Sequence, residues 1–162
     1  FIKDKFKRRT RCDIYSKFTE STSIPVIGNG DIQNFQQIED NKTHFMTLSG
    51  IMIGRISVVK PWIFSIFNNR INSISGDTSS PSIDYLNIWE TFYHYAIEDF
   101  PPEKALGRIK EFSSYYALNF FYGHEFYRIV QGSKNLEQLH ENALIFLNKE
   151  PILCKNISCS RY

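Results

Sequence analysis

The sequence predicts an α/β segment followed by an all-α segment, and three observations carry that prediction. Two short apolar runs, IPVI at residues 24–27 and GIMI at residues 50–53, are each followed by glycine and then by a helical pattern. Beyond residue 82, apolar side chains recur at helical spacing. Residues 68–82, rich in Asn, Ser, Gly and Pro, separate the two patterns as a linker. We expect part of a parallel sheet with packed helices, then a bundle of about four helices.

In the first half, strand, glycine turn and helix occur in that order twice. The run at residues 24–27 predicts a buried strand, and Asp31 is a candidate N-cap for a short helix over residues 32–41. The run at residues 50–53 predicts a second strand, and Pro61 suits the first turn of the next helix. Repetition of this order predicts that the two strands pair in parallel.

In the second half, three apolar stripes predict three of the helices. The dipeptide at Pro101 should stop the first, and the second, over residues 103–122, should end near Gly123. A shorter helix should end at Gly132. The stripes are Leu86, Trp89, Tyr93, Ala96 and Ile97; then Ala105, Ile109, Phe112, Tyr116 and Phe120; then Leu136, Leu139, Ala143, Leu144 and Leu147.

Composition and charge exclude several classes of protein. Of the 162 residues, 42% are hydrophobic and 22% are charged, so the chain is not intrinsically disordered. No apolar run approaches the roughly 20 residues of a membrane span, so we expect no membrane partner. A net charge of +2 is too small to indicate nucleic-acid binding by the whole surface. The chain opens on Phe1 without a signal-peptide pattern, which favours a fragment or a processed chain.

The cysteines and histidines predict no metal site. Cys154 and Cys159 have no second ligand pair at zinc spacing, Cys12 is remote from both, and the four histidines show no metal pattern. We expect free thiols in a reducing, cytoplasmic compartment.

The two glycine turns are the candidate ligand site. Ligands of parallel α/β sheets bind at the carboxyl ends of the strands, where helix N-termini favour anions. Gly30 and Gly54 allow close backbone approach, Asp31 can cap a helix or bind a hydroxyl, and Arg55 suits phosphate. The turns therefore predict a phosphate site, although the same residues also suit ordinary structural turns.

The N-terminal segment also leaves two interpretations open. Its cations are typical of a solvated arm or of a segment that faces phosphate. They are Lys3, Lys5, Lys7, Arg8, Arg9 and Arg11.

At the glycine turns the sequence resembles the tRNA-dihydrouridine synthases. IPVIGNGDI at residues 24–32 is similar to that family's seventh-strand signature, GIMIGR at 50–55 to its eighth, and KPWIF at 60–64 to the helix that follows. The resemblance implies the C-terminal part of a TIM (β/α)8 barrel followed by a helical domain. It also implies FMN as cofactor and NADPH as reductant in the reduction of uridine to 5,6-dihydrouridine in tRNA. The implied phosphate ligands are Asn29, Gly30, Asp31, Gly54 and Arg55.

The resemblance also implies what this chain lacks. The first barrel strands and the loop with the family's catalytic cysteine have no counterpart, so we expect no catalytic residue in this chain and no activity from it alone. Lys7 stands at a position where the family often has histidine. The missing N-terminal barrel half is then an expected partner. The predicted divisions are residues 1–76 for the partial barrel, 77–150 for the tRNA-binding helices and 151–162 for a tail.

One face of the helix expected over residues 103–122 is a candidate RNA surface. Lys104 and Arg108 lie there with Tyr115, Asn119 and Tyr122, a mixture of cations and aromatic rings that suits phosphate contact and base stacking. The same residues also fit a solvated face with amphipathic tyrosines. Two other functions stay open: another FMN-binding TIM-barrel oxidoreductase, and a non-catalytic RNA-binding module derived from the same enzymes.

Overall fold

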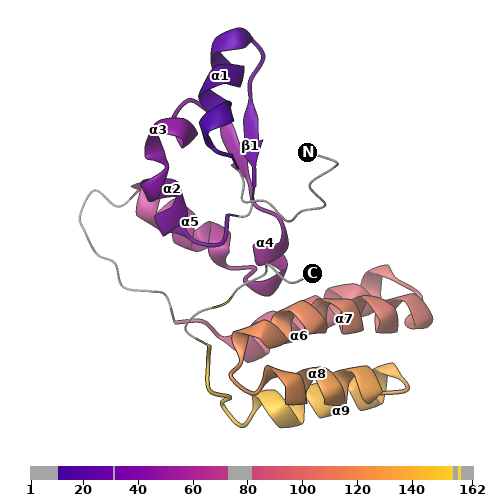
Figure 1. Cartoon of the computed structure of the whole chain (residues 1–162). Helices are drawn as coiled ribbons and strands as arrows, with labels where there is room; N and C mark the ends of the chain where they lie inside the picture. The colour runs from indigo at the N-terminus through magenta and orange to yellow at the C-terminus, as the bar shows by residue number, and fades with distance from the viewer. Residues whose placement is uncertain (1–10, 31, 73–81, 155–156, 158–162) are drawn as a thin grey trace. The chain divides into compact units, whose positions relative to one another are not determined.

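A short parallel sheet occupies one of the two units into which the chain divides (Figure 1). The computed structural model of the chain describes residues 11–30, 32–72, 82–154 and 157. We call Phe1–Ser57, Pro61–Asn72 and Ser158–Tyr162 the sheet unit, and Val58–Lys60 with Ser73–Ile157 the helical unit. The predicted boundary between residues 76 and 77 lies outside the described residues and stays a prediction.

The two predicted strands pair in parallel, as expected. β1 (Ile27–Asn29) and β2 (Gly50–Met52) form the sheet of the described residues, with Ile27 opposite Gly50. β1 begins three residues later than the apolar run that predicted it. Ile24 and Ile27 are 73% and 67% exposed, so the prediction of a buried strand is wrong for the described chain. Burial on both faces requires neighbouring elements that this two-stranded sheet lacks among the described residues.

The helices of the sheet unit are short, and three of them were not predicted. α1 (Asp13–Ser21) lies before β1, and α4 (Arg55–Val59) follows β2. The last two residues of α4, Val58 and Val59, belong to the helical unit. The helix expected after Pro61 is α5 (Ile63–Asn72).

The helix expected over residues 32–41 is shorter than predicted, and a second helix that was not predicted follows it. α2 (Phe35–Asp40) and α3 (Lys42–Phe45) divide at Asn41. Asn34, whose backbone is extended, caps α2 by accepting a hydrogen bond from the Gln37 N–H at 3.0 Å. The prediction that Asp31 caps this helix is therefore wrong, and Asp31 itself lies outside the described residues.

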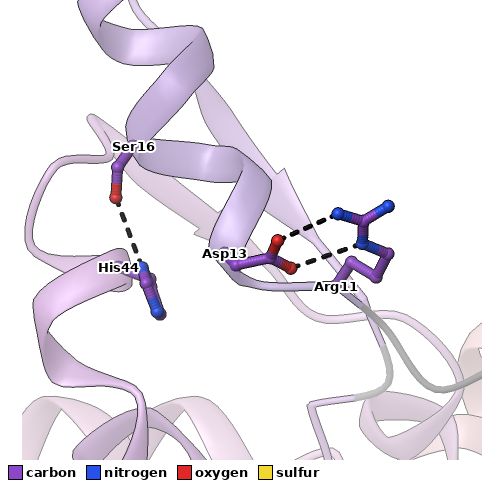
Figure 2. Close-up of polar contacts among 4 residues, drawn as sticks. All are labelled: Arg11, Asp13, Ser16 and His44. Atoms are coloured by element: carbon purple, nitrogen blue, oxygen red, sulfur yellow. Dashed lines mark hydrogen bonds and ion pairs between the residues drawn. The ribbon is translucent and has the colours of Figure 1, made fainter.

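Aromatic contacts join α1 to α3 and α2 to α5 in the sheet unit. Tyr15 of α1 is buried and its ring lies 5.7 Å from that of Phe45 in α3. Phe35 meets Phe67 of α5 edge to face at 5.5 Å. In Figure 2, Ser16 Oγ and His44 Nδ1 add a polar contact of 3.3 Å between α1 and α3.

The helical unit contains four longer α-helices in its described part. They are α6 (Tyr85–Asp99), α7 (Pro102–Tyr116), α8 (Gly123–Gly132) and α9 (Leu136–Leu147). α6 packs on α7 and α9, and α8 packs on the same two helices (Figure 1). Phe100 ends α6 just before Pro101, so the predicted stop is confirmed. No helix of the described residues is both long and apolar enough to cross a membrane.

The predicted stripes supply most of the core of the helical unit. Every member of the second stripe, from Ala105 to Phe120, is buried. Trp89 is the largest fully buried side chain, and its indole N–H donates to Ser113 Oγ at 3.0 Å. The buried indole nitrogen therefore has a hydrogen-bond partner. Ile97 is the member of the first stripe that is exposed, at 39%.

The second long helix ends six residues earlier than predicted. α7 stops at Tyr116 and continues as the 3-10 helix η2 (Ala117–Asn119). Gly123 then begins α8 instead of ending α7. A Cβ at Gly123 would collide with the Ala117 carbonyl oxygen, so glycine is required for this close approach. Phe120 stays buried because its ring packs edge to face on those of Tyr116, Phe126 and Phe146. Its backbone forms an antiparallel bridge with Leu153, which the helical spacing alone does not reveal.

Candidate functional site

The two strand ends lie at one edge of the sheet. Asn29 is the last residue of β1 and pairs with Met52, the last residue of β2. The register therefore brings Gly30 and the turn at residues 53–55 out of the sheet on the same side. Of the five predicted phosphate ligands, the backbone gathers Asn29, Gly30, Gly54 and Arg55 at this edge, while Asp31 lies outside the described residues.

The end of β1 is anchored from α1. The Tyr15 hydroxyl donates to the Asn29 carbonyl at 2.9 Å, and burial raises the pKa of this phenol above its ordinary value. A Cβ at Gly28 would collide with Leu48 Cδ1 and lie 3.4 Å from the Tyr15 ring. Gly28 is thus a packing glycine, and the exposed Asn29 side chain follows it directly.

Gly54 has a different environment from Gly28. The Gly54 carbonyl accepts hydrogen bonds from the Ser57 N–H at 2.9 Å and the Ser57 hydroxyl at 2.7 Å. A Cβ at Gly54 would meet no atom of the described chain within 4 Å, and no described glycine has a positive φ. Neither packing against the described residues nor backbone conformation therefore explains glycine at this turn. Arg55, half-buried, begins α4 directly after it.

Lys104 and Arg108 are exposed one turn apart on α7, as the sequence predicted. The Arg108 guanidinium makes an ion pair of 3.1 Å with Glu111 and lies 6.0 Å from the centre of the Phe100 ring. Both partners of the ion pair are exposed, so the pair is worth only about 0–1 kcal/mol and can open to a phosphate.

Asn119 does not belong to this surface, and that part of the prediction is wrong. Its side chain is 1% exposed, and its amide N–H groups donate to the Val59 and Tyr116 carbonyls, at 2.6 and 3.0 Å. The reason is the end of α7 at Tyr116, which turns the chain and points Asn119 into the unit. Tyr122 is exposed but lies beyond the helix break, at the start of α8.

The basic N-terminal segment is described only from Arg11 onward. Figure 2 shows the Arg11 guanidinium paired with Asp13, at 3.0 Å for the shorter contact. Arg11 lowers the pKa of the Asp13 carboxyl, and both groups are exposed. Arg11 is therefore engaged by an acid two residues away, while residues 1–10 lie outside the described residues.

The thiols and histidines of the described residues do not form a reactive or metal-binding cluster. Cys12 and Cys154 are free, and burial followed by the nearby Asp13 charge raises the pKa of the Cys12 thiol. A raised pKa disfavours the thiolate, the form that reacts. His44 faces Ser16, and the described chain groups no three His, Cys, Asp or Glu residues that could hold a metal.

Sequence reasoning missed the role of Tyr15 and placed Asn119 on the exposed surface instead of inside the unit. Tyr15 supports Asn29 across 14 positions, and Asn119 binds Val59 across 60. No local spacing connects such pairs, because a side-chain hydrogen bond to a distant carbonyl depends on the folded path of the chain.

Comparison with known proteins places this chain in a family. The family described as Dihydrouridine synthase (Dus) matches residues 4–149, so the chain belongs to the dihydrouridine synthase family and the predicted resemblance is confirmed. A probable tRNA-dihydrouridine synthase of Rickettsia conorii is 36% identical over 107 residues, which are 60% of this chain and 31% of that protein.

Similar proteins also occur in other organisms. A tRNA-dihydrouridine(47) synthase-like protein of Arabidopsis thaliana is 40% identical over 78 residues, which cover 48% of this chain and 11% of that protein. A probable tRNA-dihydrouridine synthase of Aquifex aeolicus is 35% identical over 48 residues, covering 30% and 15%. The chain spans about a third or less of the length of the curated relatives it matches.

Proposed function

We propose that this chain is the C-terminal part of a tRNA-dihydrouridine synthase, which reduces uridine in tRNA to 5,6-dihydrouridine with FMN as cofactor and NADPH as reductant. The observation that carries the proposal is the family match over residues 4–149. In this proposal residues 1–76 supply the last strands of a TIM barrel, residues 77–150 a bundle of tRNA-binding helices, and residues 151–162 a tail.

Exposed apolar side chains support the partial barrel. Ile24, Ile27 and Met52, on or beside the two strands, are 73%, 67% and 51% exposed. Parallel strands of α/β proteins are normally covered on both faces, so these side chains have the character of a surface that further strands bury. We infer that the N-terminal half of the barrel is the partner that covers them.

The residues at the sheet edge fit the phosphate of FMN. Asn29 offers an exposed amide, the open space beside Gly54 admits a ligand oxygen, and Arg55 supplies a permanently charged donor. Asp31 and Gly30 complete the proposed loop. When bound, FMN would supply the reducing equivalent for the uracil ring. The role of this chain's residues is to anchor and orient the phosphate end of the cofactor.

The loop that carries the family's catalytic cysteine has no counterpart in the sequence of this chain. Reduction of uracil needs a proton donor on the face opposite the reductant. Cys12, Cys154 and Cys159 all stand outside the sequence context of that catalytic cysteine. We therefore propose that the catalytic acid belongs to the missing half, and that the free thiols serve in a reducing, cytoplasmic compartment.

Lys104 and Arg108 are proposed to contact tRNA phosphates. Each such contact releases counterions, so the logarithm of the affinity falls with the logarithm of the salt concentration. Arg108→Ala is expected to weaken tRNA binding and to lower this salt slope by about one contact. An unchanged slope would remove Arg108 from the interface.

Titration with FMN is the decisive experiment. We expect the 162-residue chain to quench flavin fluorescence saturably. Arg55→Ala and Gly54→Val should abolish this quenching. Arg70→Ala, which changes an exposed arginine of α5, is the matched control and should keep it. Absence of binding by the folded chain would contradict a phosphate site built by these residues alone.

Activity gives the second test. With NADPH, FMN and tRNA lacking dihydrouridine, we expect no product from this chain alone and product once a relative's N-terminal half is added. Turnover by the chain alone would contradict the proposed division of the enzyme. If the chain bound tRNA but did not bind FMN, even after a relative's N-terminal half was added, the result would favour the non-catalytic RNA-binding module.

A further inference from the structure

A line of exposed aromatic rings crosses the junction between η2 and α8. Phe121 and Tyr122 are 63% and 48% exposed, and their rings meet edge to face with centroids 4.9 Å apart. The Tyr122 ring lies 6.3 Å from that of His124, which is exposed in the first turn of α8. The rings are therefore continuous from one residue to the next.

Two further side chains extend this line along α8. Tyr127, 48% exposed, and Arg128, exposed, lie three and four positions after His124 and so on the same side of the helix. We name Phe121, Tyr122, His124, Tyr127 and Arg128 the turn surface. The opposite side of α8 is buried through Phe126 and Val130.

The backbone beneath the turn surface is held from several directions. The Phe121 N–H donates to the Ile152 carbonyl at 2.8 Å, and the Cys154 N–H donates to the Asn119 carbonyl at 2.8 Å. Gly123 packs so closely on the Ala117 carbonyl that a Cβ would not fit. Rings on a fixed backbone lose little conformational freedom on binding, which favours affinity.

The charge of the turn surface indicates its occupant. Arg128 makes no ion pair within the described residues, although Glu125 lies three positions before it. Arg108 on α7, in contrast, is paired with Glu111. An unpaired guanidinium beside Tyr and His rings suits phosphate and base together.

We propose that the turn surface is a base-stacking platform for unpaired nucleotides of RNA, with Arg128 on an adjacent phosphate. The proposal rests on the proposed tRNA function and deepens it, because Lys104 and Arg108 provide charge but no exposed aromatic line. Stacking accepts any base, so the platform grips RNA without reading its sequence.

The test measures binding of an unmodified tRNA transcript to the chain by fluorescence anisotropy, at about 50 and about 200 mM salt. Tyr122→Ala is expected to weaken binding about tenfold, and Tyr122→Phe to keep it. Arg128→Gln is expected to lower the salt slope by about one, and Arg128→Lys to preserve it. The control is Tyr95→Ala, which removes a tyrosine 62% exposed on α6 and should change nothing.

Several results would overturn the proposal. Wild-type affinity and slope in both Tyr122→Ala and Arg128→Gln would show that RNA does not contact the turn surface, as would failure of the folded chain to bind tRNA. Self-association that Phe121→Ser abolishes, with tRNA affinity unchanged, would assign the surface to a protein contact. FMN titration and dihydrouridine formation are read separately, so a failed platform and a failed enzyme assignment are distinguishable.

Discussion

Gly28 lies in the middle of β1 and Gly54 two residues beyond β2, in environments that predict different responses to the same substitution. Gly28→Ala places a methyl group against Leu48 Cδ1, the end of a flexible side chain that must move aside, and we expect a loss of about 1 kcal/mol in the free energy of unfolding. Gly54→Ala meets nothing within 4 Å and should change stability by less than about 0.5 kcal/mol. Urea denaturation followed by circular dichroism measures both, and equal losses would contradict this account.

Tyr116 makes the helical unit sensitive to alkaline pH. Burial raises the pKa of its phenol, and the hydroxyl donates to the Tyr85 carbonyl at 2.7 Å. The folded chain keeps a proton that the unfolded chain loses near pH 10. The contribution of Tyr116 to stability is therefore fully present below about pH 10 and falls above it, by about 1.4 kcal/mol per pH unit.

Tyr116→Phe tests this linkage. We expect the variant to lose about 1 kcal/mol at neutral pH with the hydrogen bond, and to show a shallower decline of unfolding free energy above about pH 10. Denaturation series at several pH values measure the slope. Tyr95→Phe, at an exposed position, should keep the wild-type slope, and parallel curves for Tyr116→Phe and wild type would refute the assignment.

At the scale of elements, Lys110 joins α7 to the end of α8. Its ammonium donates to the Gln131 carbonyl at 2.9 Å and the Ser133 carbonyl at 2.6 Å, and the Gln131 amide returns a hydrogen bond to the Lys110 carbonyl at 2.8 Å. These bonds satisfy carbonyls that the helix end leaves without partners.

Lys110→Met keeps the aliphatic stem and removes the charge. We expect the free energy of unfolding to fall by about 1–3 kcal/mol, because two carbonyls lose a charged donor. Lys104→Met, on the exposed face of the same helix, is the matched control and should stay within about 0.5 kcal/mol of wild type. Thermal and urea unfolding both report the difference, and similar losses in the two variants would show that the cap is not stabilising.

At the scale of the whole molecule, the exposed apolar side chains of the sheet unit predict self-association of the isolated chain. Ile24 lies three residues before β1 and Ile27 is its first residue. The strands of a short parallel sheet also present unpaired edges. The double substitution Ile24→Thr and Ile27→Thr should reduce the associated fraction in sedimentation velocity without reducing helicity. Association that persists unchanged would place the contact elsewhere on the molecule.

The sequence by itself determined the features that depend on local spacing. The second apolar stripe from Ala105 to Phe120 is buried throughout, and Phe100 ends α6. The two segments that the apolar runs predicted as strands pair in parallel. It also determined the family, because the motifs at residues 24–32 and 50–55 are each an unbroken run of residues. Such motifs can be read even in a chain that spans only part of its relatives' length.

Only the tertiary structure decided where long-range contacts interrupt the local pattern. Periodicity continues α7 through Asn119, but the turn fixed by Gly123 against Ala117 buries Asn119 and exposes Phe121 and Tyr122. Likewise, the Tyr15 hydroxyl reaches the Asn29 carbonyl because α1, unseen in the sequence, lies beside β1. The physical reason is that propensity and periodicity act over a few residues, whereas hydrogen bonds and close packing between distant segments exist only after the chain has folded.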